Sequence, residues 1–242
     1  VLISKPPSPS VAKRVIDTLA HSEKPCTVCF LGADAPSLPD NVSFARTLKA
    51  TAELATGRSS KNKRPEFKSI IPHVTTGRQR IHGLFCGGTL SSEAQVVFLD
   101  QGVSVASNAP IPGAEAVGSG TSHVLIDLGS DEYTRGRPHP MIDPTVRDEE
   151  LTKALADPTL AVILLDVVIG FGAHPDPAGT IVRVVAAAGT ERPIVVASVT
   201  GTDDDPQDRR KQMAKLVDGG IVVAPTNADA ATLALSCLVR DD

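Results

Sequence analysis

The stretch Ala161–Thr200 reads "AVILLDVVIGFGAHPDPAGTIVRVVAAAGTERPIVVASVT". It opens with branched apolar residues up to Val168, turns through glycines, and resumes a helical pattern at Asp176-Pro177. A second apolar run begins at Ile194. An Asp before a Pro is a typical helix start, and continuous β-branched runs are typical of strands buried on both faces. The stretch therefore predicts two parallel strands joined by a right-handed helical crossover.

The same alternation extends in both directions from this stretch. Each apolar run is followed by a turn and a helical pattern, with Asp205 before Pro206 and Thr226 or Asn227 as further helix caps. The pattern predicts an α/β fold with a flavodoxin-like parallel five-stranded sheet and helices on both faces. The expected strands are Ile81–Cys86, His123–Leu128, Ala161–Val168, Ile194–Val199 and Ile221–Ala224, and the expected helices are about Thr89–Leu99, Asp148–Ala156, Pro177–Ala188, Pro206–Val217 and Asn227–Val239.

Composition excludes some classes of function. The 242 residues carry a net charge of -4 and only 3% aromatic side chains, which argues against a nucleic-acid partner. No apolar run reaches the roughly 20 residues of a membrane helix, so we expect no membrane partner. Four cysteines are few for a disulfide scaffold, which favours a cytoplasmic protein. Cys26 and Cys29 form a CxxC inside a predicted strand, where they point to opposite faces and are expected to be buried spectators.

The N-terminal residues repeat the order of a later part of the chain. Residues 1–34 read as strand, Pro-led helix and strand, like residues 161–203. We interpret residues 1–34 as the C-terminal part of a first domain, in a chain that is a fragment or docks on a partner or on its second domain. Residues 35–80 are predicted to hold a helix ending at Gly57 and a basic linker, and residues 81–242 the flavodoxin-like domain, with an irregular stretch at 100–120.

Glycine-bearing turns follow several strands on one side of the predicted sheet. Carboxyl ends of parallel strands share one rim, where helix N-termini present free N–H groups to anions. This pattern predicts a phosphate or ligand site, although tight turns use glycine for steric reasons alone. The candidate binding residues in these turns are Gly87, Gly88, Thr89, Ser91, Gly170, Gly172, Thr200 and Gly201, with Ser92 as a further hydroxyl.

The loop "GRPHPMIDP" holds the main candidate for chemistry. His139 lies between two prolines and close to Arg135 and Arg137, a combination that suits carboxylate or phosphate recognition. His139 is a candidate nucleophile or proton carrier, and the equal alternative is a stiff surface loop whose arginines pair with local acids. His174 is a second catalytic candidate, because it precedes a helix N-terminus. The acids Asp203–Asp205 are interpreted as helix capping, so no metal site is predicted.

The segments "GLFCGGTLSSEAQ", "GRPHPMID", "DPTLAVILLDVVIGFGAHPDPA" and "RPIVVASVTGTDDDPQ" strongly resemble the FdrA family. That family is similar to the succinyl-CoA synthetase α subunit and to NDP-forming acyl-CoA synthetases. The resemblance covers residues 81–242 and accounts for residues 1–34. It implies an acyl-CoA synthetase-like ligase domain and a phosphate or acyl phosphate bound at the helix that begins near Thr89. CoA and nucleotide are implied as cofactors by the resemblance only, and the CoA-binding domain is absent from this chain.

The sequence departs from the synthetases at one position. Their phosphorylated histidine lies in the loop after the strand matching Ile194–Val199, where this chain has "GTDDDPQ". The resemblance also implies an alternative, a component of a phosphate-dependent oxamate carbamoyltransferase that needs no phosphohistidine. A non-catalytic scaffold is the third reading. Expected partners are an upstream CoA-binding domain or partner subunits, an oligomer, and a small carboxylate with phosphate. The isolated fragment is expected to be inactive.

Overall fold

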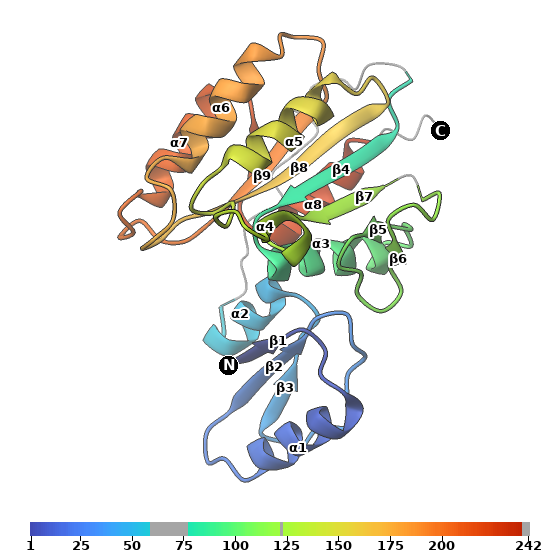
Figure 1. The fold of residues 1–242 in the computed structure, drawn as a ribbon. Coiled ribbons are helices and arrows are strands. Elements are labelled where there is room, and N and C mark those ends of the chain that lie inside the picture. The colour runs from blue at the N-terminus through green and yellow to red at the C-terminus, as the bar shows by residue number, and fades with distance from the viewer. Residues whose placement is uncertain (59–76, 122, 239–242) are drawn as a thin grey trace.

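The computed structural model describes residues 1–58, 77–121 and 123–238. They form a smaller N-terminal unit and a larger unit above it (Figure 1). The predicted basic linker at 58–69 lies almost wholly outside the described residues. The elements in chain order are β1 (Leu2–Ser4), α1 (Pro9–Ala20), β2 (Cys26–Phe30), β3 (Val42–Phe44), α2 (Leu48–Thr56), β4 (Arg80–Phe85), α3 (Gly88–Asp100), β5 (Ala106–Ser107), β6 (Glu115–Ala116), β7 (Val124–Asp127), α4 (Asp131–Thr134), α5 (Thr145–Ala156), β8 (Leu160–Val168), α6 (Pro177–Ala187), β9 (Ile194–Thr200), α7 (Arg209–Asp218), β10 (Val222–Ala224) and α8 (Asn227–Ser236).

The larger unit contains a sheet with the strand order β10-β9-β8-β4-β7-β5-β6, and every neighbouring pair is parallel. Numbered along the chain, its five main strands have the order 2-1-3-4-5, which is the flavodoxin-like order. The predicted fold class is thus confirmed. The sequence pattern did not indicate β5 and β6, which extend the β7 edge inside the stretch predicted to be irregular. Each is only two residues long, too short to show a periodic pattern.

Two hydrophobic cores cover the faces of this sheet. On one face, Ile81, Phe85 and Leu164 pack against α3 and α8. On the other face, Leu84 and Leu165 pack against α5, α6 and α7. Successive strand residues alternate between the two cores, because side chains of a strand point to opposite faces. Since both faces are covered, the strands read as continuous apolar runs in the sequence.

The helix caps explain where the sequence-based boundaries hold and where they fail. Asp176 caps α6 by accepting the Gly179 N–H at 3.2 Å, as predicted. Thr226 likewise caps α8. The predicted start of α7 at Pro206 is wrong, because Asp205 instead accepts the Thr202 N–H at 2.6 Å and closes a turn. Helix α7 begins after Asp208, whose side chain accepts the Lys211 N–H.

The N-terminal unit is a parallel sheet with the order β1-β2-β3. It repeats the arrangement of β8, β9 and β10, which are also adjacent and parallel. Strand β3 was not predicted from the sequence, and it extends this sheet past residue 34. Helix α2 ends at Gly57, as predicted. Gly57 adopts the left-handed conformation, with φ 63°, that often ends an α-helix. Cys26 and Cys29 on β2 are free thiols.

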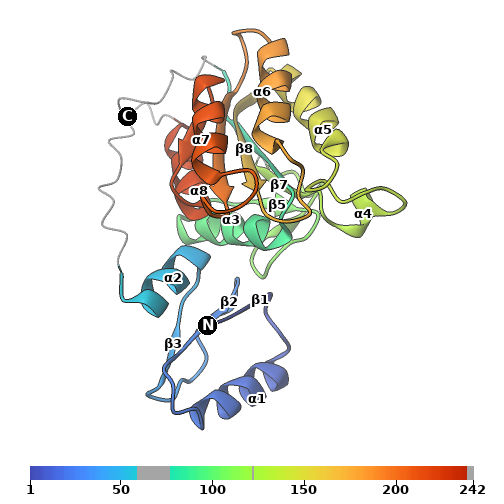
Figure 2. The same cartoon turned by 90° about the vertical axis from the view of Figure 1, so that its left-hand side faces the viewer.

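The two units meet along α2, which lies beside α3 and α8 (Figure 2). Lys49 forms an ion pair of 2.6 Å with Asp229 in the first turn of α8. The buried carboxylate of Glu93 on α3 accepts the Lys49 N–H at 3.2 Å and the Asn227 side-chain amide at 2.8 Å. Burial raises the pKa of Glu93, and these hydrogen bonds oppose that rise. One carboxylate thus connects three helices from both units.

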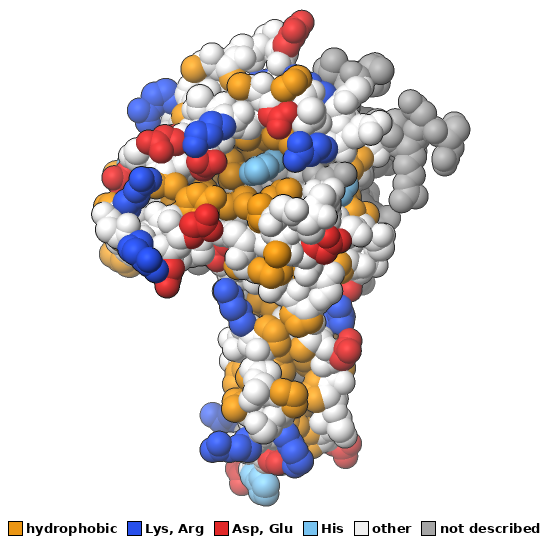
Figure 3. Space-filling model, turned by 45° about the vertical axis from the view of Figure 1, so that its right-hand side comes forward, with side chains coloured by type: hydrophobic (Ala, Val, Ile, Leu, Met, Phe, Trp, Pro, Cys, Tyr) orange, Lys and Arg blue, Asp and Glu red, His pale blue; other side chains and the backbone are white. Residues whose placement is uncertain are grey.

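Acidic and basic side chains are interspersed over the visible face of the molecule, without a large patch of one sign (Figure 3). Within residues 1–58, 77–121 and 123–238, no helix combines the length and apolar character needed to cross a membrane.

We predict that Glu93→Ala lowers the free energy of unfolding by about 2–4 kcal/mol. The substitution leaves the Lys49 N–H and the Asn227 amide without their acceptor, and each buried unsatisfied donor costs about 1–3 kcal/mol. Urea denaturation measures the change. Glu149→Ala, at an exposed position of α5, is the control and should change stability by less than about 0.5 kcal/mol. Equal losses in the two variants would contradict the role assigned to Glu93.

Candidate functional site

The turn between β4 and α3 is organised by a carboxylate of the protein itself. Asp166 on β8 accepts the N–H groups of Cys86 and Gly87, each at 2.7 Å. The Asp166 side chain has no solvent exposure, and burial raises its pKa to about 6. Two amides of the predicted anion-binding turn are therefore already used. Within the described residues, the amides of Gly88, Thr89 and Leu90 have no acceptor, as is usual in the first turn of a helix.

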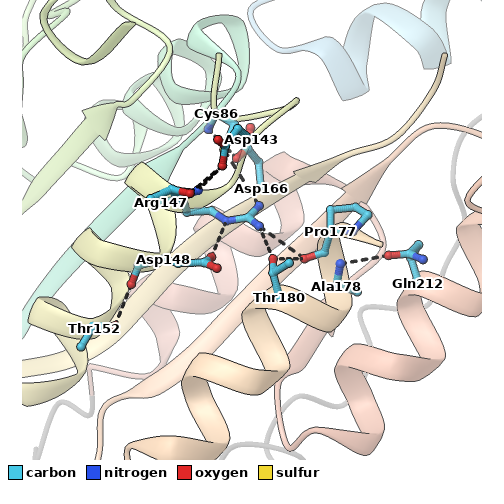
Figure 4. A network of polar contacts seen from close by, with 11 residues as sticks. Cys86, Asp143, Arg147, Asp148, Thr152, Asp166, Pro177, Ala178, Thr180 and Gln212 are labelled. Carbon is cyan, nitrogen blue, oxygen red and sulfur yellow. Dashed lines mark hydrogen bonds and ion pairs between the residues drawn. The ribbon is translucent and has the colours of Figure 1, made fainter. Parts of the chain in front are cut away.

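Arg147 on α5 is the cation next to this carboxylate, with only 2% of its surface exposed. Its guanidinium donates to the Thr180 hydroxyl at 2.8 Å and to the Pro177 carbonyl at 3.3 Å (Figure 4). It also approaches the Cys86 sulfur at 4.0 Å and lowers the pKa of Asp166. Arg147 thereby ties α5 and α6 to the carboxyl end of β8.

Cys86 is not suited to nucleophilic chemistry. Its thiol is 2% exposed, and burial raises its pKa to about 12, with the charge of Asp166 acting in the same direction. The reactive form of cysteine is the thiolate, which is essentially absent at neutral pH in such an environment.

Asp127, at the end of β7, is the second carboxylate at the start of α3. A Cβ atom on Gly88 would lie 2.5 Å from Asp127 Oδ2, so only glycine lets the helix approach so closely. Burial raises the pKa of Asp127, while the Gly129 N–H, Lys5 and His139 lower it. Asn108 fixes this strand end by accepting the Asp127 N–H at 2.8 Å. An acceptor group thus stands beside the free amides of α3.

His139 lies over the same strand end. A Cβ atom on Gly129 would be 2.7 Å from His139 Nε2 and 3.2 Å from Asp127 Oδ1, so glycine makes room for the ring. The other ring nitrogen, Nδ1, accepts the Met141 N–H at 3.2 Å. Because Nδ1 is an acceptor, the proton of the neutral ring is on Nε2. His139 therefore presents an N–H donor to the rim.

The arginines of this loop are exposed. Within the described residues, neither Arg135 nor Arg137 forms a side-chain hydrogen bond or ion pair. The alternative in which they pair with local acids is therefore not found. The nearby Asp143 accepts from Thr145 instead, through both its N–H and its hydroxyl.

His174 lies in the neighbouring loop after β8. Its Nδ1 accepts the Asp176 N–H at 3.1 Å, so its neutral ring also carries the proton on Nε2. The backbone N–H of His174 donates to the Met141 carbonyl at 2.7 Å, and this bond joins the two histidine loops. Gly170 and Gly172 have φ values of 144° and 82°, which glycine adopts readily. The Gly170 N–H and carbonyl both bond to the Gln207 side chain.

The loop after β9 completes the rim. Thr200 is exposed, and its carbonyl accepts the Ile169 N–H at 3.0 Å. Gly201 has φ 146° and leaves no room for a side chain beside Ile169. Asp205 binds Thr202, and Asp203 forms an ion pair of 2.7 Å with Arg210. These contacts agree with a local structural role for the acids.

Close contacts and hydrogen bonds connect several of the predicted residues along one rim. Gly88 lies against Asp127, and Gly129 lies against both Asp127 and His139. Hydrogen bonds then lead from His139 through Met141 to His174, and from His174 through Gln207 to Gly170. Ser91 is buried instead, since it is 1% exposed and lies near Gln95, which donates to it at 3.4 Å. Ser92 is equally buried and donates back to the Gly88 carbonyl. These two hydroxyls point into the protein, so we no longer assign them to ligand binding.

Several polar residues of this region were not predicted. Asp166, Arg147, Asp127 and Gln207 are all at least nine-tenths buried. The single charged residue inside the apolar run "AVILLDVV" is a signal that marks Asp166, since an unpaired charge is rarely placed in a buried strand. The role of Gln207 has no comparable signal. Among the described residues, no group of three or more His, Cys, Asp or Glu side chains is arranged to hold a metal ion.

We predict that Asp166→Asn destabilises the protein at pH 4 by about 1–3 kcal/mol, because the amide NH2 group cannot accept from one of the two N–H groups, whereas the hydroxyl oxygen of the protonated carboxyl can. The native pKa of Asp166, about 6, lies above the value of 3.8 for a free aspartate. The native state thus holds its proton more tightly, and the stability that this residue contributes falls as pH rises from about 4 to 6. Urea denaturation at several pH values in this range should show that the difference in free energy of unfolding between wild type and variant becomes smaller as pH rises. A constant gap contradicts the raised pKa.

Comparisons with known proteins identify the family of the chain. Residues 84–237, more than half of the chain, match the CoA-ligase family. YahF from Escherichia coli strain K12, described as uncharacterized, is 35% identical over 260 residues, which span 100% of this chain and 50% of YahF. The chain therefore spans about half the length of this curated relative.

Two solved structures resemble the chain at low identity. PH0766 from Pyrococcus horikoshii OT3 is 14% identical with a TM-score of 0.49, over 98% of this chain and 50% of that one. The dinucleotide-forming acetyl-coenzyme A synthetase 1 from Candidatus Korarchaeum cryptofilum, in its apo form, is 16% identical with a TM-score of 0.47, over 98% and 52%. On the evidence of the match over residues 84–237, the chain belongs to the CoA-ligase family.

Proposed function

We propose that the chain is the ligase-type domain of an acyl- or carbamoyl-transferring enzyme that works without a phosphohistidine. A phosphate and a small carboxylate bind at the rim formed by the start of α3, the His139 loop and the Gly170–Gly172 loop. FdrA is the proposed subfamily. Residues 81–242 form the proposed ligase domain, which follows the end of a first domain at 1–34 and a helix and linker at 35–80. The proposed partners are an upstream CoA-binding domain or partner subunits.

The observation that carries this proposal is the hydrogen bonding of the two histidines. His139 and His174 each use Nδ1 as an acceptor, from Met141 and Asp176 respectively. Their Nε2 atoms then carry protons and have no lone pair for attack on phosphorus. Phosphorylation at Nε2 requires that the Nδ1 hydrogen bond first be broken. A hydrogen-bond donor at Nε2 is the role that needs no such change.

The mixture of donors and acceptors favours carbamoyl transfer as the specific reaction. His139 Nε2, the amides of Gly88–Leu90 and the unpaired Arg135 and Arg137 are donors for phosphate and carboxylate oxygens. Asp127 is an acceptor beside them, which suits the NH2 group of a carbamoyl substrate. A ligand that carried only negative oxygens would be repelled by an ionised Asp127.

The proposed reaction transfers the carbamoyl group of oxalurate to phosphate. A phosphate oxygen attacks the carbamoyl carbon, a C–O bond forms, and the C–N bond to oxamate breaks. The departing nitrogen takes the proton that the attacking phosphate loses. His139 Nε2–H donates a hydrogen bond to the carbamoyl oxygen, on which negative charge develops during the attack. Arg135 and Arg137 balance the charge of the phosphate and the oxamate carboxylate.

We expect the full-length protein with its partner subunits to form carbamoyl phosphate from oxalurate and phosphate. His139→Ala should lower kcat by about 10²–10³-fold, the usual cost of removing one hydrogen-bond donor to a developing oxyanion. Arg137→Ala should mainly raise KM. His21→Ala is the matched control, since His21 lies at the end of α1 and its Nδ1 contacts the Asp17 carbonyl. Coupled assay of carbamoyl phosphate measures each variant.

Three results would overturn the proposal or part of it. Labelling of His139 or His174 by radioactive ATP would show a phosphohistidine ligase of the synthetase type. Full activity of His139→Ala would remove His139 from the chemistry. A complete protein that neither reacts nor binds phosphate or oxamate would be a scaffold that has kept the fold alone.

A further inference from the structure

Gln207 is a buried amide in the loop after β9, and only 7% of its surface is exposed. Its Oε1 accepts the Gly170 N–H at 3.1 Å. Its Nε2 lies within hydrogen-bonding distance of three carbonyls of the neighbouring loop, those of Gly170 at 2.9 Å, His174 at 3.2 Å and Ala173 at 3.4 Å. The Gln207 side chain thus provides hydrogen-bond partners for the backbone of the loop that follows β8.

From Gln207, hydrogen bonds lead to the ring of His139. Gln207 Nε2 donates to the His174 carbonyl, and the His174 N–H donates to the Met141 carbonyl at 2.7 Å. The Met141 N–H then donates to His139 Nδ1 at 3.2 Å. Three loops, which follow β9, β8 and α4, are connected in this order. The last bond in the series determines which ring nitrogen of His139 carries the proton.

The chemistry of glutamine suits this position. One side chain must accept from the Gly170 N–H and donate to the carbonyls. A primary amide does both, because it has a carbonyl oxygen and an NH2 group. A glutamate would keep the acceptor for Gly170 but place a negative oxygen against carbonyl groups. A leucine would leave the Gly170 N–H and the carbonyls without partners in a site closed to water.

We infer that Gln207 is the positioning residue that holds His139 with its proton on Nε2, acting through the His174 and Met141 backbone. The inference deepens the proposed function, on which the importance of His139 rests. It assigns the loop after β9 a role as a fixed support of the rim.

The ring nitrogens of His139 report on this inference without any assay of activity. In the full-length wild-type protein with ¹⁵N-labelled histidine, NMR should show His139 Nδ1 as the unprotonated nitrogen and Nε2 as the protonated one. In Gln207→Leu, the two resonances should move toward each other, because both tautomers become populated. Gln95→Leu is the matched control. Gln95 is also a buried glutamine that bridges backbone groups, but it contacts Ile111 and Ala109, away from the His139 loop.

Unchanged His139 resonances in a folded Gln207→Leu protein would overturn the inference, as would an equal shift in Gln95→Leu. If Gln207→Leu does not fold, Gln207→Glu retains the size and one acceptor, and the same shift is expected. Where the wild-type enzyme is active, Gln207→Leu should lower kcat by about 10-fold or more with a smaller change in KM, because misplacement of a reacting group slows the chemical step. If the wild type is inactive but the resonances shift as expected, the proposed function fails and the positioning role stands.

Discussion

The double hydrogen bond from the Cys86 and Gly87 amides to Asp166 is the interaction on which the rim depends. It joins the ends of the two central strands, β4 and β8, and it sets the direction in which α3 leaves the sheet. A buried carboxylate without partners is very costly, and here two amides and the nearby Arg147 offset that cost. The amides that remain free at the start of α3 are those of the following residues.

This arrangement explains why the turn between β4 and α3 contains two glycines. Gly87 and Gly88 are needed because carboxylates of the protein approach the backbone closely, Asp166 at the first and Asp127 at the second. The positive end of the α3 dipole is therefore partly compensated from within the fold. A ligand at this rim meets both donors and an acceptor, which is a different environment from a simple phosphate cradle. A group with a carbonyl and an NH2 matches such an environment better than a bare anion.

The rim is also held together from outside the sheet. Backbone groups of Met141 and His174 join the two histidine loops, and the Gln207 side chain joins them to the loop after β9. Since each bond uses a backbone group or a buried amide, the ring orientations of His139 and His174 depend on packing far from the rings themselves. In each ring, the nitrogen that carries the proton is thus decided by a backbone N–H two residues further along the same loop.

The sequence by itself determined the α/β class, the order of the main strands and helices, and the capping of α6 and α8. These features depend on local periodicity and on residues a few positions apart, such as Asp176 before Pro177. The start of α7 was missed because Asp205 bonds to Thr202 instead of capping a helix. Strands β5 and β6 were missed because two residues show no period.

Only the tertiary structure decided the composition of the site. The partners of Asp166 are about 80 positions away in the chain, and Gln207 reaches loops more than 30 positions away. No local pattern encodes such pairs, since they form only when the crossovers bring the carboxyl ends of the strands to one rim. The protonated nitrogen of His139 is decided in the same way, by a backbone N–H whose direction depends on the folded loop.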